Sequence, residues 1–297
     1  MRGIYLISIL AVIMLVTGVE QCPMPQGGGL GGGTSSAKSG LDASLVQGVG
    51  YLKQGMTIQQ GDTFKVLINL ANYDKTEKRG IICVKDNQDD SYGGIPLSGE
   101  CSPFYVAAAD YQDEKLANAA SQQIALPIQG DYSYYDIPIS SSAKIFISYS
   151  YVQNSIAQAN INVPSPEQET VAMQQPSAPV SVSVEKAVSK QQEQYKLTLG
   201  MTLSKQSSQE IKLYSEDMSI ENSIKFTAKL SPKKEFAGYP LDCTQNNPGI
   251  INIENTKFIK CSALLPLEIT SYPLLIYTDY GVKVTKTIDF TISKEKI

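Results

Sequence analysis

Cysteines, carboxylates and tyrosines are the residues of this chain that could do chemistry, because the sequence contains no His. A Ser-His-Asp or Cys-His mechanism is therefore excluded, and so is any metal site with a His ligand. Paired carboxylates could still act as general acid and base. Asp110, Asp113 and Glu114 form such a cluster, but acidic residues also suit the first turn of a helix. We therefore predict no enzyme, no catalytic residue and no cofactor.

Four of the five cysteines form two equally spaced pairs. Cys101 follows Cys83 by 18 residues. Cys261 follows Cys243 by the same interval. In an exported protein this pattern favours one disulfide in each half, although four cysteines allow three pairings. A metal site is disfavoured, since the chain has no Cys-x-x-Cys motif. The equal spacing also suggests a duplicated domain.

The N-terminus has the features of a secretory signal. Arg2 precedes the apolar run Ile4–Val16, and small residues follow it. We expect a signal peptide or membrane anchor helix at residues 1–21, with a buried helix as the alternative. Cys22 then begins a Gly/Ser-rich tether at residues 22–43, and the arrangement resembles a lipoprotein N-terminus with lipid on this cysteine. The residue before it is not the small one of a lipobox, so an unpaired or interchain thiol is the alternative.

An acidic loop lies between the first two paired cysteines. Asp86, Asp89 and Asp90 offer the oxygen ligands that Ca²⁺ prefers, in a pattern that opens like an EF-hand loop. The pattern then fails, because Ser91 stands at the position of the sharp-turn Gly and Leu97 at that of the bidentate Glu. A solvated turn is the alternative to a weak Ca²⁺ site.

Three tyrosines, Tyr132, Tyr134 and Tyr135, lie close together in the sequence. Tyrosine suits recognition surfaces because it gives amphipathic contact area at little entropy cost. It suits packing at the edge of a β-sandwich equally well. In a strand, Tyr132 and Tyr134 would share one face and Tyr135 would point the other way. Both interpretations, a packed cluster and a binding surface, stay open.

The wider pattern is that of strands. Apolar and polar side chains alternate along several short segments, the clearest being residues 62–70, 180–184, 195–203 and 223–230. Turn residues separate these segments, which predicts an all-β fold of two tandem immunoglobulin-like β-sandwich domains. We expect domain 1 at residues 44–163 and domain 2 at residues 180–297, joined by a Pro-rich linker at residues 164–179.

One segment departs from the strand pattern. Asp113–Leu126 places Leu116, Ala120 and Ile124 at intervals of four, with an acidic start and many alanines. We expect a helix there, within an insertion of domain 1 at about residues 104–136. The helix would either lie over the sandwich or bind a partner, since loops on rigid scaffolds carry function.

The charges limit the class of partner. The chain carries 25 Lys and Arg against 29 Asp and Glu, which is no basic footprint for nucleic acid. Residues 41–163 contain 8 basic and 13 acidic groups, whereas residues 181–297 contain 15 and 13. This difference favours a cationic partner for the first half.

The leader and the tether are followed by a Gly-Asp pair before a long strand, in the segment GDTFKVLINLANYDK that begins at Gly61. In these features the chain resembles the immunoglobulin-like modules of prokaryotic, especially archaeal, cell-surface proteins. The resemblance implies a surface binding or structural role and transfers no functional residue. We expect an extracytoplasmic protein, anchored to the membrane or at the cell surface, that acts in adhesion or envelope assembly through a protein or glycan partner. A self-assembling envelope subunit and a glycan- or small-ligand-binding module with exposed tyrosines are the alternatives.

Overall fold

The computed structural model describes residues 40–112, 115–163, 168–176, 178–206, 210–231, 239–267 and 270–294. Within them the chain is all-β, as predicted, and the one helical element is a short 3-10 turn at Asp90–Tyr92. Residues Lys38–Ile297 form one compact unit. The expected leader helix, Cys22 and most of the tether lie outside the described residues.

The first half is built on six principal strands: β1 (Leu41–Leu45), β4 (Val66–Asn72), β5 (Lys78–Asp86), β6 (Glu100–Val106), β9 (Ala120–Leu126) and β11 (Ser141–Val163). β4 pairs with β1 on one side and β9 on the other. β5 pairs with β6 and β11. Burial alternates along β4 and β11, so each strand turns one face toward the core.

The second half repeats this order strand for strand: β13 (Val180–Gln191), β14 (Gln194–Lys205), β16 (Ser223–Leu230), β18 (Gly249–Asn252), β19 (Thr256–Pro266) and β20 (Thr270–Ser293). β14 pairs with β13 and β19. β16 pairs with β18 and β20. The first, second and fifth principal strands of each half therefore share one sheet, and the third, fourth and sixth share another. The identical order supports a duplicated fold.

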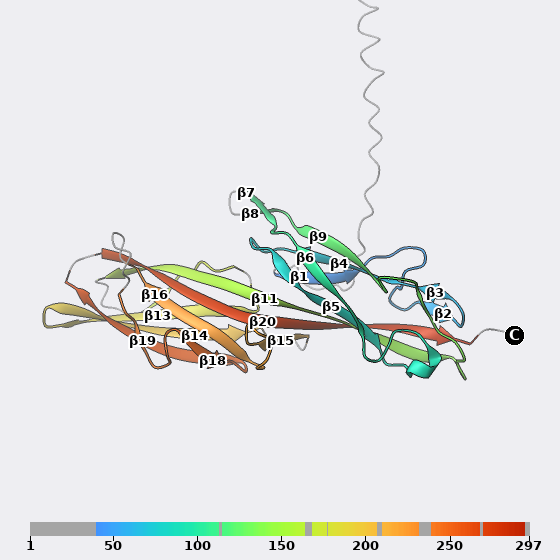
Figure 1. Cartoon of the computed structure of the whole chain (residues 1–297). Helices are drawn as coiled ribbons and strands as arrows, with labels where there is room; N and C mark the ends of the chain where they lie inside the picture. Colours follow the sequence, from blue (N-terminus) through green and yellow to red (C-terminus); the bar gives the residue numbers. More distant parts are fainter. Residues whose placement is uncertain are drawn as a thin grey trace, which may run out of the picture. The chain divides into compact units, whose positions relative to one another are not determined.

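Two long strands join the halves. β11 and β20 pair antiparallel along all 23 residues of β11. At about 3.4 Å per residue, the ladder is roughly 75 Å long. Only part of each strand pairs with other strands of its own half: β11 pairs with β5 at Ile145–Tyr151, and β20 pairs with β16 at Leu274–Asp279 and with β15 at Gly281–Val284. β11 and β20 are the sixth strands of the two halves, and each continues beyond its own half alongside the other. Each half is therefore completed by the long strand of its neighbour (Figure 1).

The two predicted domains consequently share an eight-stranded sheet. Its order is β18-β16-β20-β11-β5-β6, and β15 and β2 also pair with β20. The remaining short strands are β2 (Thr57–Gln59), β3 (Thr63–Phe64), β7 (Asp110–Gln112), β8 (Lys115–Asn118), β10 (Tyr132–Ser133), β12 (Glu169–Val171), β15 (Ile211–Tyr214) and β17 (Asp242–Cys243). β12 lies inside the predicted linker and pairs with β13.

Both favoured disulfides are present, Cys83–Cys101 and Cys243–Cys261. Each joins residues that are directly opposite on neighbouring strands, β5 and β6 in the first half and β17 and β19 in the second. The counterparts of β5 and β6 are β16 and β18, so the two disulfides occupy non-equivalent places. The strand order, and not the equal cysteine spacing, is therefore the trace of the duplication.

The helix predicted at Asp113–Leu126 is wrong. Residues 115–118 form β8 and residues 120–126 form β9, while residues 113 and 114 are not described. β9 pairs with β4 along its whole length, with Ile124 opposite Ile68. The ladder satisfies a row of backbone hydrogen bonds and buries Ile124 and Leu126, which outweighs the local helix preference.

Candidate functional site

The outward face of the eight-stranded sheet is the surface with the most distinctive chemistry. Alternation along β5, β11, β16 and β20 turns every second side chain away from the core. We call these side chains, with those of β6 and β15 in the same rows, the outward face. The strand register places its residues side by side, and one row runs across four strands through Lys212, Lys283, Ser150 and Ile81.

Cations outnumber carboxylates on the outward face. Its strand positions carry seven cations, Arg79, Lys85, Lys144, Lys212, Lys225, Lys229 and Lys283, and two carboxylates, Asp279 and Asp289. Seven minus two leaves +5 at these strand positions, and +3 when Glu77 and Glu221, the loop partners of Arg79 and Lys212, are included, in a chain whose formal net charge is −4. The count by halves concealed this concentration, because the cations come from both halves.

Four of these cations have no carboxylate partner. Arg79, Lys144 and Lys212 each form an exposed ion pair, of the kind that contributes little to stability. Within the described part of the chain, no ion pair forms at the other four, Lys85, Lys225, Lys229 and Lys283. These four lysines therefore leave positive charge open to a ligand.

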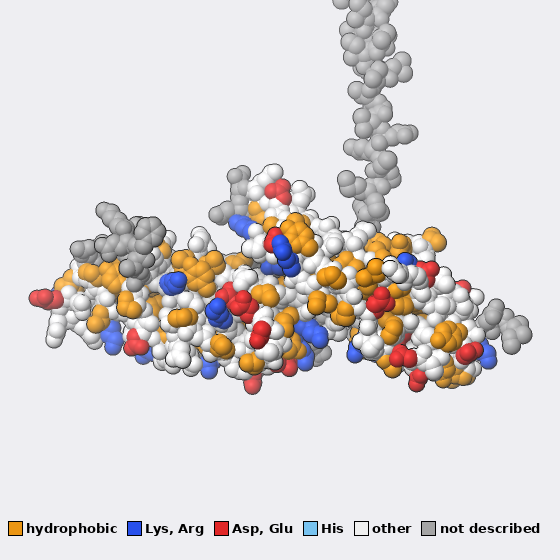
Figure 2. All heavy atoms as spheres, in the orientation of Figure 1, with side chains coloured by type: hydrophobic (Ala, Val, Ile, Leu, Met, Phe, Trp, Pro, Cys, Tyr) orange, Lys and Arg blue, Asp and Glu red, His pale blue; other side chains and the backbone are white. Residues whose placement is uncertain are grey.

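Aromatic and aliphatic side chains lie between the cations. Lys85 Nζ lies 5.8 Å from the ring centre of Phe146. Lys229 Nζ lies 5.5 Å from that of Tyr277. Exposed apolar residues of this sheet are Ile81, Tyr105, Val152, Ile156 and Ile250. Figure 2 shows one face of the molecule, where hydrophobic side chains form several patches with Lys and Arg among them. Exposed apolar side chains gathered in patches mark interaction sites, and the cations among them attract ligands of negative charge.

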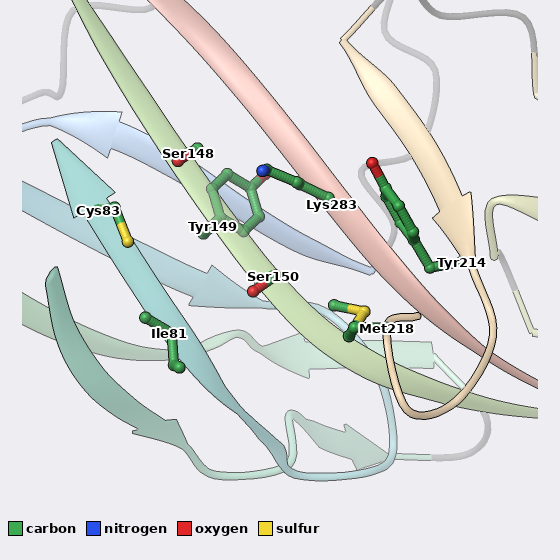
Figure 3. A pocket seen from close by; sticks show the side chains of 8 residues that line it. All are labelled: Ile81, Cys83, Ser148, Tyr149, Ser150, Tyr214, Met218 and Lys283. Atoms are coloured by element: carbon green, nitrogen blue, oxygen red, sulfur yellow. The ribbon is translucent and has the colours of Figure 1, made fainter. Parts of the chain in front are cut away.

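A cavity of about 220 Å³ opens on the outward face beside Lys283. Figure 3 shows the Lys283 side chain reaching from β20 toward β11, which contributes Ser148 and Ser150. The serines are small, so the floor of the sheet is low at this point. Larger side chains surround it, from Ile81, Tyr214 and Met218.

The loop after β15 forms one wall of the cavity. Met218 packs over Gly281, where a Cβ would come within 2.1 Å of the Met218 sulfur. Asp217 holds the loop, because its Oδ1 accepts hydrogen bonds from the Ser215 hydroxyl at 2.5 Å and the Ser219 hydroxyl at 2.7 Å. The hydrogen bond from Ser215 is the largest cause, and together with those from Ser219 it lowers the pKa of Asp217 to about 2. The carboxylate beside Met218 is therefore ionised at neutral pH.

The three predicted Ca²⁺ ligands serve their own loop. Asp86 is buried and accepts the Tyr134 hydroxyl at 2.5 Å and two backbone N–H groups. Asp89 and Asp90 each accept a backbone N–H from the same loop. In the described residues, no group of three or more His, Cys, Asp or Glu could hold a metal ion. Burial is the largest cause that raises the pKa of Asp86.

Two of the three predicted surface tyrosines are core residues. Tyr132 is 5% exposed and Tyr134 is 0% exposed, whereas Tyr135 is 51% exposed. The Tyr132 hydroxyl donates to Glu100 at 2.9 Å, and both buried rings lie against Phe64. Burial is the largest cause that raises the pKa of both hydroxyls. The packing interpretation is therefore confirmed for these two, and an exposed patch of all three is excluded.

The predicted insertion, residues 104–136, carries the hairpin of β7 and β8. All four residues of β8 are exposed. Most polar residues of the insertion are uncharged, and the cations of the outward face lie on strands outside it. Its role as a binding surface stays a prediction.

Sequence reasoning missed the outward face, although part of its signal was readable. Lys225 and Lys229 occupy polar positions of the predicted strand at residues 223–230 and so share a face. The sequence could not reveal that β16 lies beside β20, or that β20 lies beside β11. Those neighbours are distant along the chain, and only the pairing of strands brings their cations together.

Comparisons with known proteins assign no family to this chain. No protein-family model matches the sequence, and no curated protein matches it. One similar solved structure is the envelope protein VP37 from White Spot Syndrome Virus, at 9% identity and a TM-score of 0.28, covering 44% of this chain and 97% of that one. A likeness this low carries no argument about fold or function. In the part of the chain that is described, no helix has the length and apolar character to cross a membrane.

Proposed function

We propose that this chain is an exported, non-enzymatic protein that works at the cell surface by binding a partner through the outward face of its shared sheet. Two disulfides support the location, since disulfides persist mainly in oxidising compartments. The signal-like N-terminus gives independent support and would anchor or export the protein.

In this proposal each half is an immunoglobulin-like sandwich. The first, second and fifth strands form one sheet and the third and sixth lie in the other, as in that fold, whereas the fourth strand here lies beside the third and not with the first sheet. The long strand of the other half takes the place of the seventh strand, beside the sixth. The shared ladder would hold both sandwiches to one binding surface.

The charge on the outward face is the observation that carries the proposal. A net positive surface on a chain of −4 is not needed for folding, because the four unpaired lysines form no ion pair in the described structure. Concentrated like charge has a cost in self-repulsion, and it steers partners of opposite charge. The tyrosine-based alternative loses support, because Tyr132 and Tyr134 are buried.

Two variants with equal charge change test the proposal. The face variant is Lys85→Gln/Lys229→Gln/Lys283→Gln. The control variant is Lys53→Gln/Lys190→Gln/Lys260→Gln, which changes three exposed lysines outside the outward face. Because the substitutions are exposed, both proteins should fold alike.

The purified full-length protein and both variants are added to the producing cells, and bound protein is measured. An impermeant biotin reagent on intact cells reports in parallel whether the native protein is surface-exposed. We expect surface labelling, binding by the unmodified and control proteins, and loss of binding by the face variant. Absence of labelling, or equal binding by both variants, would contradict the proposal. Light scattering on the purified protein separates self-assembly from binding, since a structural subunit would form large assemblies unaided.

A further inference from the structure

We propose that the partner of the outward face is an acidic polysaccharide, whose chain runs along β11 with an acidic group at the cavity beside Lys283. This inference rests on the proposed function and names the chemical class of its partner. Four observations carry it: the spacing of the unpaired cations, the side chains between them, the cavity, and the loop that interrupts the surface.

The unpaired lysines are evenly spaced along the sheet. Lys85 on β5 lies opposite Phe146 on β11, which lies opposite Thr287 on β20, so the three residues share one row. Lys225 lies opposite Asp279, and Lys229 lies opposite Leu275. With Lys283 itself, the four rows therefore fall at β20 positions 287, 283, 279 and 275. Each step of four residues spans about 14 Å, so the cations extend over about 40 Å. A compact ligand could not reach all four, whereas a linear polymer with repeated acidic groups could.

The side chains between the cations are of polar and aromatic types that suit sugars, although the Gln158 amide already donates to Gln174 Oε1 at 3.0 Å. Ser148, Ser150, Asn154 and Gln158 lie on the outward side of β11 and carry hydroxyl or amide groups. Such groups both donate and accept hydrogen bonds, as sugar hydroxyls do. Phe146 and Tyr277 add aromatic surface against which a sugar ring can pack. One carboxylate, Asp279, lies in this region and accepts a hydrogen bond from the Asn154 amide at 2.8 Å.

The cavity supplies the best-defined position for one acidic group. The Lys283 ammonium has no ion-pair partner in the described structure, and the two serines lie on the same side. The cavity, with a volume of about 220 Å³, can admit a monosaccharide unit but not a folded segment of protein. Ile81 and Met218 form its apolar side, where the C–H face of a sugar can lie.

Two other polyanions fit this surface less well. Double-stranded DNA carries one charge per about 1.7 Å, far denser than one lysine per about 14 Å, and its binding sites are more basic. An anionic bilayer requires an uninterrupted surface, whereas Met218 and its loop stand across the sheet at Gly281.

The test measures binding of the full-length protein to immobilised polysaccharides at low ionic strength. The acidic probes are polygalacturonate, which carries carboxylates, and heparin, which also carries sulfates. Dextran is the neutral polysaccharide, and a DNA duplex and vesicles containing phosphatidylglycerol represent the other polyanions. We expect binding to at least one acidic polysaccharide and none to dextran. The face variant should lose affinity by about tenfold or more, while the control variant changes little.

Three other results would overturn the inference. Equal losses in both variants would mean non-specific attraction, and tighter binding to DNA or vesicles would identify a different partner. Failure to bind either acidic polysaccharide would exclude the class tested. If the face variant nevertheless loses cell binding, and enzymatic removal of acidic polysaccharide from the cells has no effect, the proposed function stands and only its partner is wrong. Polysaccharide binding by a protein that is not surface-exposed would instead leave this inference intact and refute the location.

Discussion

Removing the charge of Lys78 should destabilise the protein by about 3–5 kcal/mol, because the change leaves a buried carboxylate without its partner. Lys78 is 1% exposed, and its Nζ lies 2.9 Å from Asp74 Oδ2. The same ammonium donates to Gln153 Oε1 at 2.8 Å and to Thr76 Oγ1 at 3.0 Å. Gln153 lies opposite Tyr280 near the middle of the long ladder, so this cluster lies where the two halves meet.

Lys78→Met keeps most of the length of the side chain and removes only its charged end. The expected loss is a large fraction of the 5–15 kcal/mol that is typical of whole domains. Adding Asp74→Asn should restore at least about half of the loss, because the second change neutralises the stranded charge. The amide oxygen can still accept the Gly40 N–H that Asp74 Oδ1 accepts at 3.2 Å. Lys144→Met is the matched control, since Lys144 forms an exposed pair at 4.0 Å and should cost at most about 1 kcal/mol.

The assay is urea unfolding with disulfides intact, followed by tyrosine fluorescence, for which the chain offers 17 Tyr and no Trp. Free energies are compared at one pH and ionic strength. A cost below about 1 kcal/mol for Lys78→Met would refute the reasoning, and so would equal costs for Lys78→Met and Lys144→Met. A double variant no more stable than the single one would show that the loss comes from packing rather than from charge.

Three further predictions follow from the fold. Burial raises the pKa of Asp86 above 3.8, so the folded state keeps the Asp86 proton at a pH where the unfolded state has released it. The free energy of unfolding should therefore fall as the pH rises from 3.8 through the folded pKa. Asp86→Asn should flatten this part of a pH series of urea titrations, and an unchanged slope would contradict the prediction. Replacing Cys83 and Cys101 by Ser should lower the free energy of unfolding by about 3 kcal/mol, as expected for closing a loop of this length. Urea unfolding of the proteins with and without the disulfide measures the difference. A difference below about 1 kcal/mol would show that the β5–β6 ladder does not need the bond. A protease site inserted between β11 and β12 should yield two fragments that still co-elute on gel filtration after cleavage, because the β11–β20 ladder holds them; separation without denaturant would contradict the shared sheet.

Much of the local structure was readable from the sequence. The alternation in residues 180–184 and 195–203 predicted β13 and β14, because a strand with one buried face must alternate apolar and polar side chains. The local cysteine pairings were also favoured correctly. The prediction failed at residues 113–126, because spacing by four and high Ala content describe a local preference only. Pairing of β9 with β4 is a tertiary contact that outweighs this preference.

The candidate site was largely unreadable for a related reason. The tyrosine cluster was left between packing and exposure, and burial of Tyr134 against Asp86 decided it. The acidic loop looked like a ligand set, yet its carboxylates accept hydrogen bonds from their own loop. Side chains of one type and spacing thus serve either role, and their neighbours in space decide which.

The sequence by itself determined the all-β class, most strand positions, the favoured disulfides and the expectation of export, since these depend on local pattern and composition. Only the tertiary structure decided that β11 and β20 pair from end to end, so that each half completes the other. The same pairing assembled the outward face, by placing Lys283 beside Ser150 although they are far apart in sequence. Strand partners are chosen by the packing of whole sheets, and this choice leaves no short-range mark along the chain.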